Sequence, residues 1–440
     1  MADISPALFM FPMLFVLVFA GIPVAFSLIA TACLFGYLSF GMTLTTQFQS
    51  RLYDVSSNFI LAAVPLFVFM GAMLERAGIA ARLFEAIKIW FGPVRGGLAI
   101  TTVIMCGIFA ASSGVVGAVE IVVGIMAVPA MLAAGYKRDL AAGTVCAGGS
   151  LGTTIPPSIV IVVYASITEM SVGDLFAGIV IPAGVMVGLF LLYIVARVWL
   201  QPDAGPGLAA EETGHSLGEK LRIAFTALLP ASFLVLAVLG SLFAGIAAPT
   251  EAAALGAVGA VILSIAYRQF SMKVLVEALR QTIRITSMVM LIVLGGVLFA
   301  SVFIVHGGDG LVAKLVQGNG LGSTGIVILF LFVVFLLGFV LDWISVLIIV
   351  LPIADPLVRG AGIDPLWFGV MVCIVLQTSY LTPPMAPSIF YLRSIAPPGV
   401  TYIDMYKGVV PFIGAQMITL LVVALYPKSA TWLPKILFGF

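Results

Sequence analysis

The chain has 440 residues, of which 62% are hydrophobic and only 9% are charged. This composition lies outside the range of soluble globular domains and is typical of proteins that reside in a lipid bilayer. The formal net charge is +1 and the sequence has no long basic run, which excludes nucleic-acid binding as a function.

Five apolar segments are predicted to cross the membrane in the first half of the chain, residues 1–200. The first segment has no basic residues before it and continues past any plausible cleavage site, so we interpret it as a retained span and not as a signal peptide. The spans are predicted at 7–20, 22–40, 58–76, 139–170 and 174–199.

The segment 97–134 lies between the third and fourth spans and is interrupted by Ser112, Ser113 and Gly114. Its two arms, of about 15 to 19 residues, are short for complete spans. We therefore predict a re-entrant helical hairpin whose tip is the Ser-Ser-Gly sequence. The alternative is that these small residues only allow close packing between helices.

The fourth span contains the sequence GSLGTTIPPSIV at 149–160, with a Pro-Pro pair in an apolar run. Proline lacks a backbone N–H and blocks the preceding helical turn, so the pair is expected to break the helix. Irregular backbone at membrane depth is tolerated only inside protein or beside a wet cavity. The break therefore predicts a binding site, where freed carbonyl groups face a cation and helix N-termini face an anion. A plain proline kink is the alternative.

The second half, residues 222–440, has the same order of segments, after a polar segment at 201–221 that is predicted to be a flexible cytoplasmic linker. A second hairpin is predicted at 324–361, and a second Pro-Pro pair breaks the segment 366–393. Amphipathic stretches near 79–92 and 271–284 are expected in the membrane interface. The remaining spans are predicted at 222–244, 249–268, 285–305 and 401–426.

An internal duplication relates the two halves. A shift of 227 residues superposes the two Pro-Pro pairs and gives eight identities within 127–157. The superposed pairs are Ala127 and Ala354, Pro129 and Pro356, Ala134 and Ala361, Gly135 and Gly362, Val145 and Val372, Cys146 and Cys373, Pro156 and Pro383, and Pro157 and Pro384. We therefore predict two repeats of about five spans each, with a hairpin and a broken helix in both.

Five crossings per repeat is an odd number, so the second repeat is predicted to be inverted relative to the first. The predicted connections on one side carry fifteen of the twenty Lys and Arg residues, and those on the other side carry five. The positive-inside rule places the richer side in the cytoplasm. Both termini are then expected on the periplasmic side.

Hydroxyl and glycine residues gather at the four breaks, and neutral oxygens of this kind suit sodium, by extension from the rule for other hard cations. We predict two sodium sites, one per repeat, and an organic anion bound at the same breaks. The predicted sodium-binding residues are Ser112, Ser113, Gly114, Gly149, Ser150, Gly152, Thr154, Gly338, Asp342, Thr378, Ser379 and Thr382. The predicted substrate-binding residues are Ser113, Thr153, Thr154, Pro157, Ser158, Thr382, Pro384 and Ser388.

Two acidic residues within apolar segments allow more than one interpretation. Asp342 either ligates sodium or caps and orients the second hairpin tip, because ionisable groups inside the membrane are costly and usually functional. Glu120 either interacts with a proton or a cation, or forms an ion pair at the cytoplasmic edge. We predict no catalytic residues, no cofactor and no transition-metal site, because the sequence has no HExxH pair, no P-loop and no nucleophile with a histidine base.

Four motifs in order resemble the large membrane subunit of tripartite ATP-independent periplasmic (TRAP) transporters, over essentially the whole chain. They are IPPSI at 155–159, GIAAPTEAAALGA at 245–257, LGFVLDWISVLIIVLPI at 337–353 and LTPP at 381–384. The sequence departs from the family pattern at Glu120 and at LQTSY, 376–380. Both departures touch the predicted site, so the substrate and the ligand set stay open.

The resemblance implies a sodium-driven elevator transporter in a bacterial inner membrane. It also implies a periplasmic binding protein that delivers a small organic acid anion, and a separate small membrane subunit of about four helices. In such an elevator, 97–170 and 324–394 would form the transport body, and the other spans would form a scaffold that the amphipathic stretches join to it. A self-sufficient sodium/anion symporter and, less favoured, an intramembrane hydrolase are the alternatives.

Overall fold

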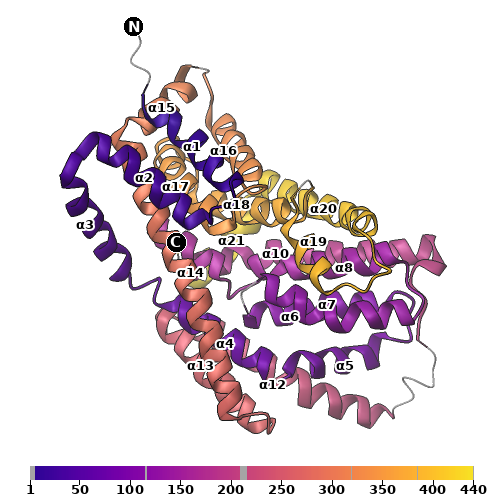
Figure 1. Ribbon diagram of the computed structural model, residues 1–440. Coiled ribbons are helices and arrows are strands. Elements are labelled where there is room, and N and C mark those ends of the chain that lie inside the picture. Colours follow the sequence, from indigo (N-terminus) through magenta and orange to yellow (C-terminus); the bar gives the residue numbers. More distant parts are fainter. Residues whose placement is uncertain (1–4, 114–115, 209–215, 319, 384, 440) are drawn as a thin grey trace.

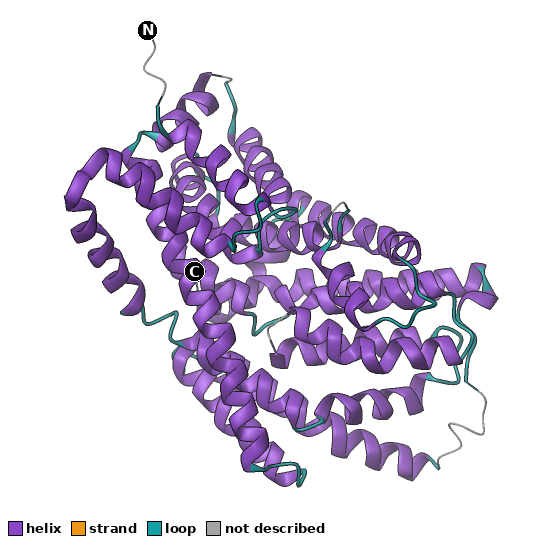
Figure 2. Ribbon diagram, viewed as in Figure 1, coloured by secondary structure: helices purple, strands orange, loops and turns teal. Residues whose placement is uncertain are grey.

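The computed structural model describes residues 5–113, 116–208, 216–318, 320–383 and 385–439. Within these ranges the chain consists of helices joined by turns and loops, and contains no strand (Figure 2). Seven of the described helices are long and apolar enough to cross a membrane, or up to eight if a bent pair counts as one span. The predicted class, an all-α polytopic membrane protein, is confirmed.

In the first half, a series of helices precedes the first hairpin, and the broken helix and one more helix follow it. The helices are α1 (Ala7–Phe19), α2 (Val24–Phe40), α3 (Leu44–Ser56), α4 (Ala63–Arg76), α5 (Ile79–Phe91), α6 (Gly97–Ser113), α7 (Val116–Ala133), α8 (Arg138–Ser150), α9 (Ile159–Thr168) and α10 (Val172–Leu200). Short 3₁₀ turns follow α2 and α8, and the second of these is η2 (Leu151–Thr153).

The second half has the same order of elements. Its helices are α12 (Leu217–Phe243), α13 (Pro249–Ala266), α14 (Met272–Val305), α15 (Gly308–Gly318), α16 (Ser323–Leu337), α17 (Trp343–Gly360), α18 (Pro365–Leu381), α19 (Pro387–Ile395), α20 (Tyr402–Leu425) and α21 (Lys428–Phe438). Several begin at capping residues, which satisfy the free N–H groups of the first turn. Ser216 with Glu219, and Thr401 with Asp404, form complete capping boxes.

The contacts between helices define two groups, whose members are labelled in Figure 1. In the first group the long helix α14 packs against α2 and α4, and α13 packs against α4 and α12. The second group contains both predicted hairpins: α6 packs along α7, and α16 packs along α17. The broken helices α8–α9 and α18–α19 also belong to the second group, so all four breaks lie in one part of the molecule.

Close packing between helices supports the 227-residue relation. At Gly408 of α20, a Cβ atom would come within 2.1 Å of the Asp139 carbonyl oxygen on α8. Gly178 of α10, which matches Gly408 once the three-residue insertion is included, faces Leu366 and Val370 on α18. Leu366 lies 227 residues after Asp139. The two repeats therefore place the last helix against the same part of the broken helix.

This packing also bears on the predicted division into body and scaffold. The last helices α10 and α20 were expected in the scaffold, but their contacts join them to the broken helices. Phe190 of α10 packs edge-to-face against Phe412 of α20, with ring centroids 5.2 Å apart. The contacts therefore favour a transport body that includes α10 and α20. That this body moves during transport stays a prediction.

One of the two amphipathic stretches differs from what the sequence suggested, and the interfacial position of the other stays a prediction. The stretch 271–284 is not a separate interfacial arm, because it continues into the span and forms the first part of α14. The stretch 79–92 forms α5, which buries one face against α6 and α12. Under the 227-residue shift α14 corresponds to α3 and α4 together, so the first repeat breaks a helix that the second keeps whole.

The linker between the halves is not flexible over its first part. The backbone N–H of Gly96 donates to the Gly205 carbonyl at 2.8 Å, and that of Lys137 donates to the Ala204 carbonyl at 3.0 Å. The buried Ala204 is part of the core cluster. With the N–H of Leu208, which donates to the Gly92 carbonyl at 2.8 Å, three backbone hydrogen bonds hold this segment. Residues 209–215 lie outside the described residues, and the end of the predicted linker forms the start of α12.

Candidate functional site

The first break connects α8 to α9 through η2, and its hydroxyl side chains are buried. Thr153 donates to the carbonyl of Ser150 at 2.9 Å, and Ser158 donates to the carbonyl of Thr153 at 2.8 Å. Such local bonds give the backbone an alternative to the helical ladder, so they stabilise the turn before the prolines. The predicted residues Gly152 and Pro157 are buried in the same turn.

A buried polar network connects this break to the second repeat. The Ser150 hydroxyl accepts hydrogen bonds from the amide groups of Gln377, at 3.1 Å, and Gln416, at 3.3 Å. The Thr154 hydroxyl donates to the side-chain oxygen of Gln377. Ser150 and Gln377 are 227 residues apart, so two equivalent positions meet where the repeats join.

The second break lies between α18 and α19. The hydroxyl groups of Thr378, Ser379 and Thr382 each donate to a backbone carbonyl three or four residues earlier. A Cβ atom on Gly338, at the end of α16, would lie 2.2 Å from the Ser379 hydroxyl oxygen. Glycine is therefore required where the second hairpin meets the second broken helix, and two of the predicted sodium residues, Gly338 and Ser379, lie against each other.

Asp342 caps α17 in this structure. Its carboxylate accepts from the backbone N–H groups of Ile344 and Ser345, at 3.2 and 3.4 Å, and from the Ser345 hydroxyl at 2.5 Å. These bonds satisfy the N–H groups at the start of the helix and place a negative charge at the positive end of its dipole. Of the two interpretations of Asp342, capping is the one that the geometry shows.

Glu120 is fully buried, and among the described residues neither of its carboxyl oxygens has a hydrogen-bond partner. Its side chain lies over Gly149, where a Cβ atom would come within 1.8 Å of the Glu120 Cγ atom. The expected ion pair at the cytoplasmic edge is therefore wrong. Ser388 of α19, a predicted substrate residue, is also buried with an unpartnered hydroxyl.

Four predicted residues fall at or beyond the edge of the described structure. Gly114 and Pro384 lie outside the described residues, and the side chains of Ser112 and Ser113 are not described either. The tip of the first hairpin thus stays a prediction, as does the second Pro-Pro pair.

A cavity of about 530 Å³ lies where the two groups of helices meet, and residues near all four breaks form its wall. Gly117 follows the first hairpin tip, and Ile159 begins the helix after the first break. Asp342 begins the arm after the second tip, and Tyr380 lies just before the second break. The opposite wall comes from α2 and α14, which include Phe26 and Met288.

The predicted substrate residues that the structure describes do not line this cavity, although they are near its wall in the sequence. Ile159 and Val160 line it directly after Ser158, Tyr380 lies two residues before Thr382, and Tyr391 lies three residues after Ser388. On one helix, some side chains point toward the cavity and the others pack against neighbouring helices. The sequence therefore located the breaks, but not which residue at each break reaches the cavity.

Sequence analysis missed four polar residues. Gln377 and Tyr380 lie within the LQTSY sequence, which was noted only as a departure from the family pattern. Tyr391 gave no separate signal, and Gln416 was not singled out. A buried amide inside a span is costly unless it is hydrogen-bonded, and this cost was the signal available for both glutamines.

Two hairpins, two broken helices and a central cavity shared by all of them are the features of a secondary transporter. A family model described as "Tripartite ATP-independent periplasmic transporter, DctM component" matches residues 11–429. The chain belongs to this family, which confirms the resemblance that its motifs suggested and makes it a permease subunit and not an enzyme.

Individual relatives agree with this assignment. The C4-dicarboxylate TRAP transporter large permease protein DctM of Pseudomonas aeruginosa is 34% identical over 391 residues, 88% of each chain. The ectoine TRAP transporter large permease protein TeaC of Halomonas elongata is 29% identical over 94% of each chain. The isethionate TRAP transporter permease protein DctMQ of Oleidesulfovibrio alaskensis is 27% identical, and the match covers 97% of this chain but 65% of that protein.

A solved structure has a similar fold. The YdaH transporter of Alcanivorax borkumensis superposes with a TM-score of 0.66, with 12% sequence identity, and the match covers 96% of this chain and 98% of that one. At this identity the likeness concerns the fold alone.

Proposed function

We propose that this chain imports a small organic anion across the bacterial inner membrane, coupled to sodium. The observation that carries the proposal is the cavity, because residues next to each of the four breaks form part of its wall. A change at any break would therefore alter the same volume. Hydroxyl and carbonyl oxygens of the breaks would supply the sodium ligands, since hydroxyl oxygens that donate one bond keep lone pairs to accept or ligate.

The position of the cavity suggests how transport proceeds. Its walls come from both groups of helices, so a displacement of the group with the breaks relative to α2 and α14 would open it to either side. This is the elevator arrangement that the family resemblance implies. The substrate named for the relatives varies between a dicarboxylate, a sulfonate and ectoine, so family membership does not name the substrate here.

We further propose two protein partners: a small membrane subunit and a periplasmic binding protein that delivers the substrate. The DctMQ relative supports the first, because it extends well beyond the length of this chain. The exposed apolar side chains of α12 and α13, such as Phe233, Leu236 and Ile262, offer a surface for another membrane protein or for lipid.

The proposal is tested by uptake of radiolabelled organic anions into proteoliposomes with an inward sodium gradient. We expect uptake only when the chain, the small subunit and the binding protein are all present. Sodium-driven uptake by the chain alone would favour the self-sufficient symporter. Uptake that does not depend on the sodium gradient, in every combination of the three proteins, would contradict sodium coupling.

Thr382→Val refines this test. The Thr382 hydroxyl lies at the second break, so its loss is expected to raise the sodium concentration that gives half-maximal uptake, with little change in the amount of folded protein. Thr226→Val is the matched control, because Thr226 on α12 makes the same hydrogen bond to the carbonyl four residues earlier, far from the breaks. An equal effect of both substitutions would remove Thr382 from the sodium site.

A further inference from the structure

Few side chains in the described wall of the cavity can donate a hydrogen bond to a substrate. No lysine, arginine or histidine lines the described wall, and the one charged side chain there is that of Asp342. Four neutral side chains of this wall carry an N–H or O–H group, namely Ser287, Trp343, Tyr380 and Tyr391. Ser287 is exposed and Trp343 is half-buried, so water competes for both.

Tyr380 is the most deeply buried of these four donors. It is only 6% exposed and still lines the cavity, and its hydroxyl group has no hydrogen-bond partner among the described residues. The hydroxyl groups of Thr378, Ser379 and Thr382, in contrast, each donate to the backbone of their own segment. A buried donor without a partner is costly, so a ligand that accepts a hydrogen bond from Tyr380 would recover that cost.

Tyr391 reaches the same cavity from the other side of the second break. It belongs to α19, whereas Tyr380 belongs to α18. A Cβ atom on Gly117 would lie 3.0 Å from the ring of Tyr391, so this ring rests on α7 just after the first hairpin tip. Its hydroxyl group also has no partner among the described residues. The two phenol groups are close enough to interact electrostatically, so two free donors share one part of the wall.

The nearby carboxyl groups do not use these two donors. Glu120 and Asp342 both lie within electrostatic reach of the two tyrosines. The carboxylate of Asp342 accepts from Ile344 and Ser345, and the oxygens of Glu120 have no partner among the described residues. An anion beside the tyrosines would lie near the like charge of Asp342 unless a cation accompanied it, which agrees with the proposed coupling to sodium.

We propose that Tyr380 and Tyr391 recognise the acid group of the transported organic anion, each donating a hydrogen bond to one of its oxygens. The inference rests on the proposed function of the same cavity. A hydrogen bond to an ionised acceptor is stronger than one between neutral groups, and two donors from two helices match the two oxygens of a carboxylate. Tyr380 contributes more than Tyr391, because Tyr391 is 38% exposed and its hydroxyl group competes with water.

The test begins with the choice of an anion. Sodium-driven uptake of radiolabelled succinate, pyruvate and benzoate is compared in proteoliposomes that contain the chain and its small subunit, with the binding protein present. The anion with the greatest uptake is then the ligand for the purified complex of the chain with its small subunit. The binding protein is left out of this second step, so that its own affinity does not enter. The unfolding midpoint as a function of anion concentration, in sodium, gives the affinity.

Tyr380→Phe removes the hydroxyl group and keeps the ring. We expect this variant to bind the anion about tenfold more weakly or worse, because a donor to a charged group is lost. The unfolding midpoint without the anion should not fall, since the hydroxyl group has no partner in the described structure. Tyr391→Phe is expected to weaken binding less, by about threefold.

Tyr164→Phe is the matched control. Tyr164 of α9 is fully buried and its hydroxyl group likewise has no partner among the described residues. It lies against α18, where a Cβ atom on Gly369 would be 3.0 Å from the Tyr164 hydroxyl oxygen, and it does not line the cavity. The same chemical change should therefore leave the affinity for the anion unchanged.

Two results would overturn the inference: an unchanged affinity in Tyr380→Phe, or an equal loss of affinity in Tyr164→Phe. Either result leaves the proposed function in place if the unmodified assembly takes up the anion with sodium. Absence of sodium-driven uptake for all three anions would instead refute the proposed function, and this inference with it.

Discussion

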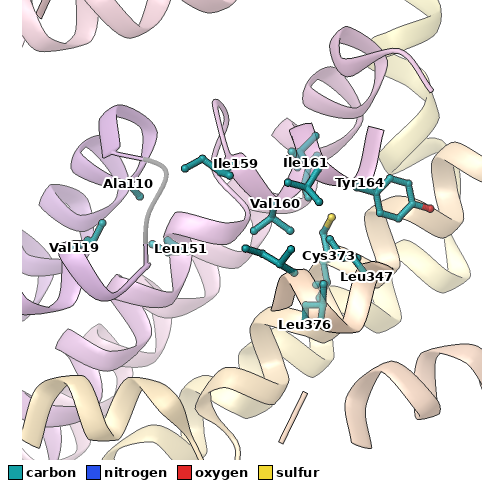
Figure 3. Packing of buried hydrophobic residues seen from close by; sticks show 14 of the residues in the cluster. Ala110, Val119, Leu151, Ile159, Val160, Ile161, Tyr164, Leu347, Cys373 and Leu376 are labelled. Atoms are coloured by element: carbon teal, nitrogen blue, oxygen red, sulfur yellow. The ribbon is translucent and has the colours of Figure 1, made fainter. Parts of the chain in front are cut away.

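The two hairpins differ in what they bury at matching positions. In the first, the carboxyl group of Glu120 lies over Gly149 and has no partner among the described residues. The positions 227 residues later are Leu347 and Leu376, which are buried with Cys373 and Val160 in an apolar cluster (Figure 3). At matching positions, one repeat therefore buries a carboxyl group and the other buries leucine.

The helices that follow the breaks, in contrast, begin alike in the two repeats. α9 and its counterpart α19 both start without a side-chain cap, although Asp342 caps the hairpin helix α17 of the second repeat. The polar network of Ser150, Gln377 and Gln416 connects the first break to the second repeat. The comparison teaches that inverted repeats can share the arrangement of their helix ends and still differ in the side chains that they bury beside them.

The largest effect on stability is expected when the buried residues at the matching positions, Glu120 and Leu347, are exchanged. Leu347→Glu would bury a carboxyl group in the apolar cluster, at a cost of about 3 kcal/mol or more in the free energy of unfolding. Thermal unfolding of the purified protein in detergent measures this as a lower midpoint and a lower yield. The converse change, Glu120→Leu, is expected to raise the midpoint, because it removes a buried group that has no partner.

If Glu120→Leu instead destabilises the protein as much as Leu347→Glu does, then Glu120 makes a stabilising interaction with a structural partner. A transport defect in Glu120→Leu without loss of stability would show that the carboxyl group takes part in the transport cycle.

A smaller effect is expected from the helix contacts that the repeats share. Gly408→Ala places a methyl group within 2.1 Å of a backbone oxygen, whereas Gly178→Ala places it 2.9 Å from the nearest atom, the carbonyl oxygen of Ala430. Overpacking of this kind costs about 1 to 3 kcal/mol, and we expect Gly408→Ala near the upper end and Gly178→Ala near the lower. Equal midpoints of unfolding for the two variants would contradict this order.

Loss of the polar network around Gln377 is expected to have the next largest effect on stability. Gln377→Leu leaves the hydroxyl groups of Ser150 and Thr154 without their partner from α18, which is expected to cost about 2 kcal/mol. Gln377→Glu keeps the acceptor oxygens and serves as the companion variant. We expect thermal unfolding to show a larger loss for leucine than for glutamate at a pH where the carboxyl group is protonated, and the reverse order would mean that the network contributes little.

Removal of the Asp342 cap of α17 is expected to have the smallest effect on stability. Asp342→Ala loses the cap of α17, worth about 1 kcal/mol in typical helices. Asp342→Asn keeps the acceptor oxygen without the charge, so its unfolding midpoint should lie close to that of the unmodified protein. Midpoints that fall equally for both variants would mean that the charge of Asp342, and not its cap hydrogen bonds, stabilises the start of α17.

The sequence determined which segments form apolar helices and where these helices break. Apolar length and the missing N–H of proline are local properties, so the helices from α6 to α9 and from α16 to α19 could be predicted without knowledge of their neighbours. The 227-residue relation between Cys146 and Cys373 likewise needed only comparison of the chain with itself.

Only the tertiary structure decided which side chains meet. It brought Ser150 against Gln377, placed Tyr380 and Tyr391 in the cavity wall, gave Asp342 to the start of α17 and left Glu120 without a partner. The physical reason is that helix periodicity fixes the faces of each helix, whereas contact between faces depends on how helices far apart in the sequence pack together.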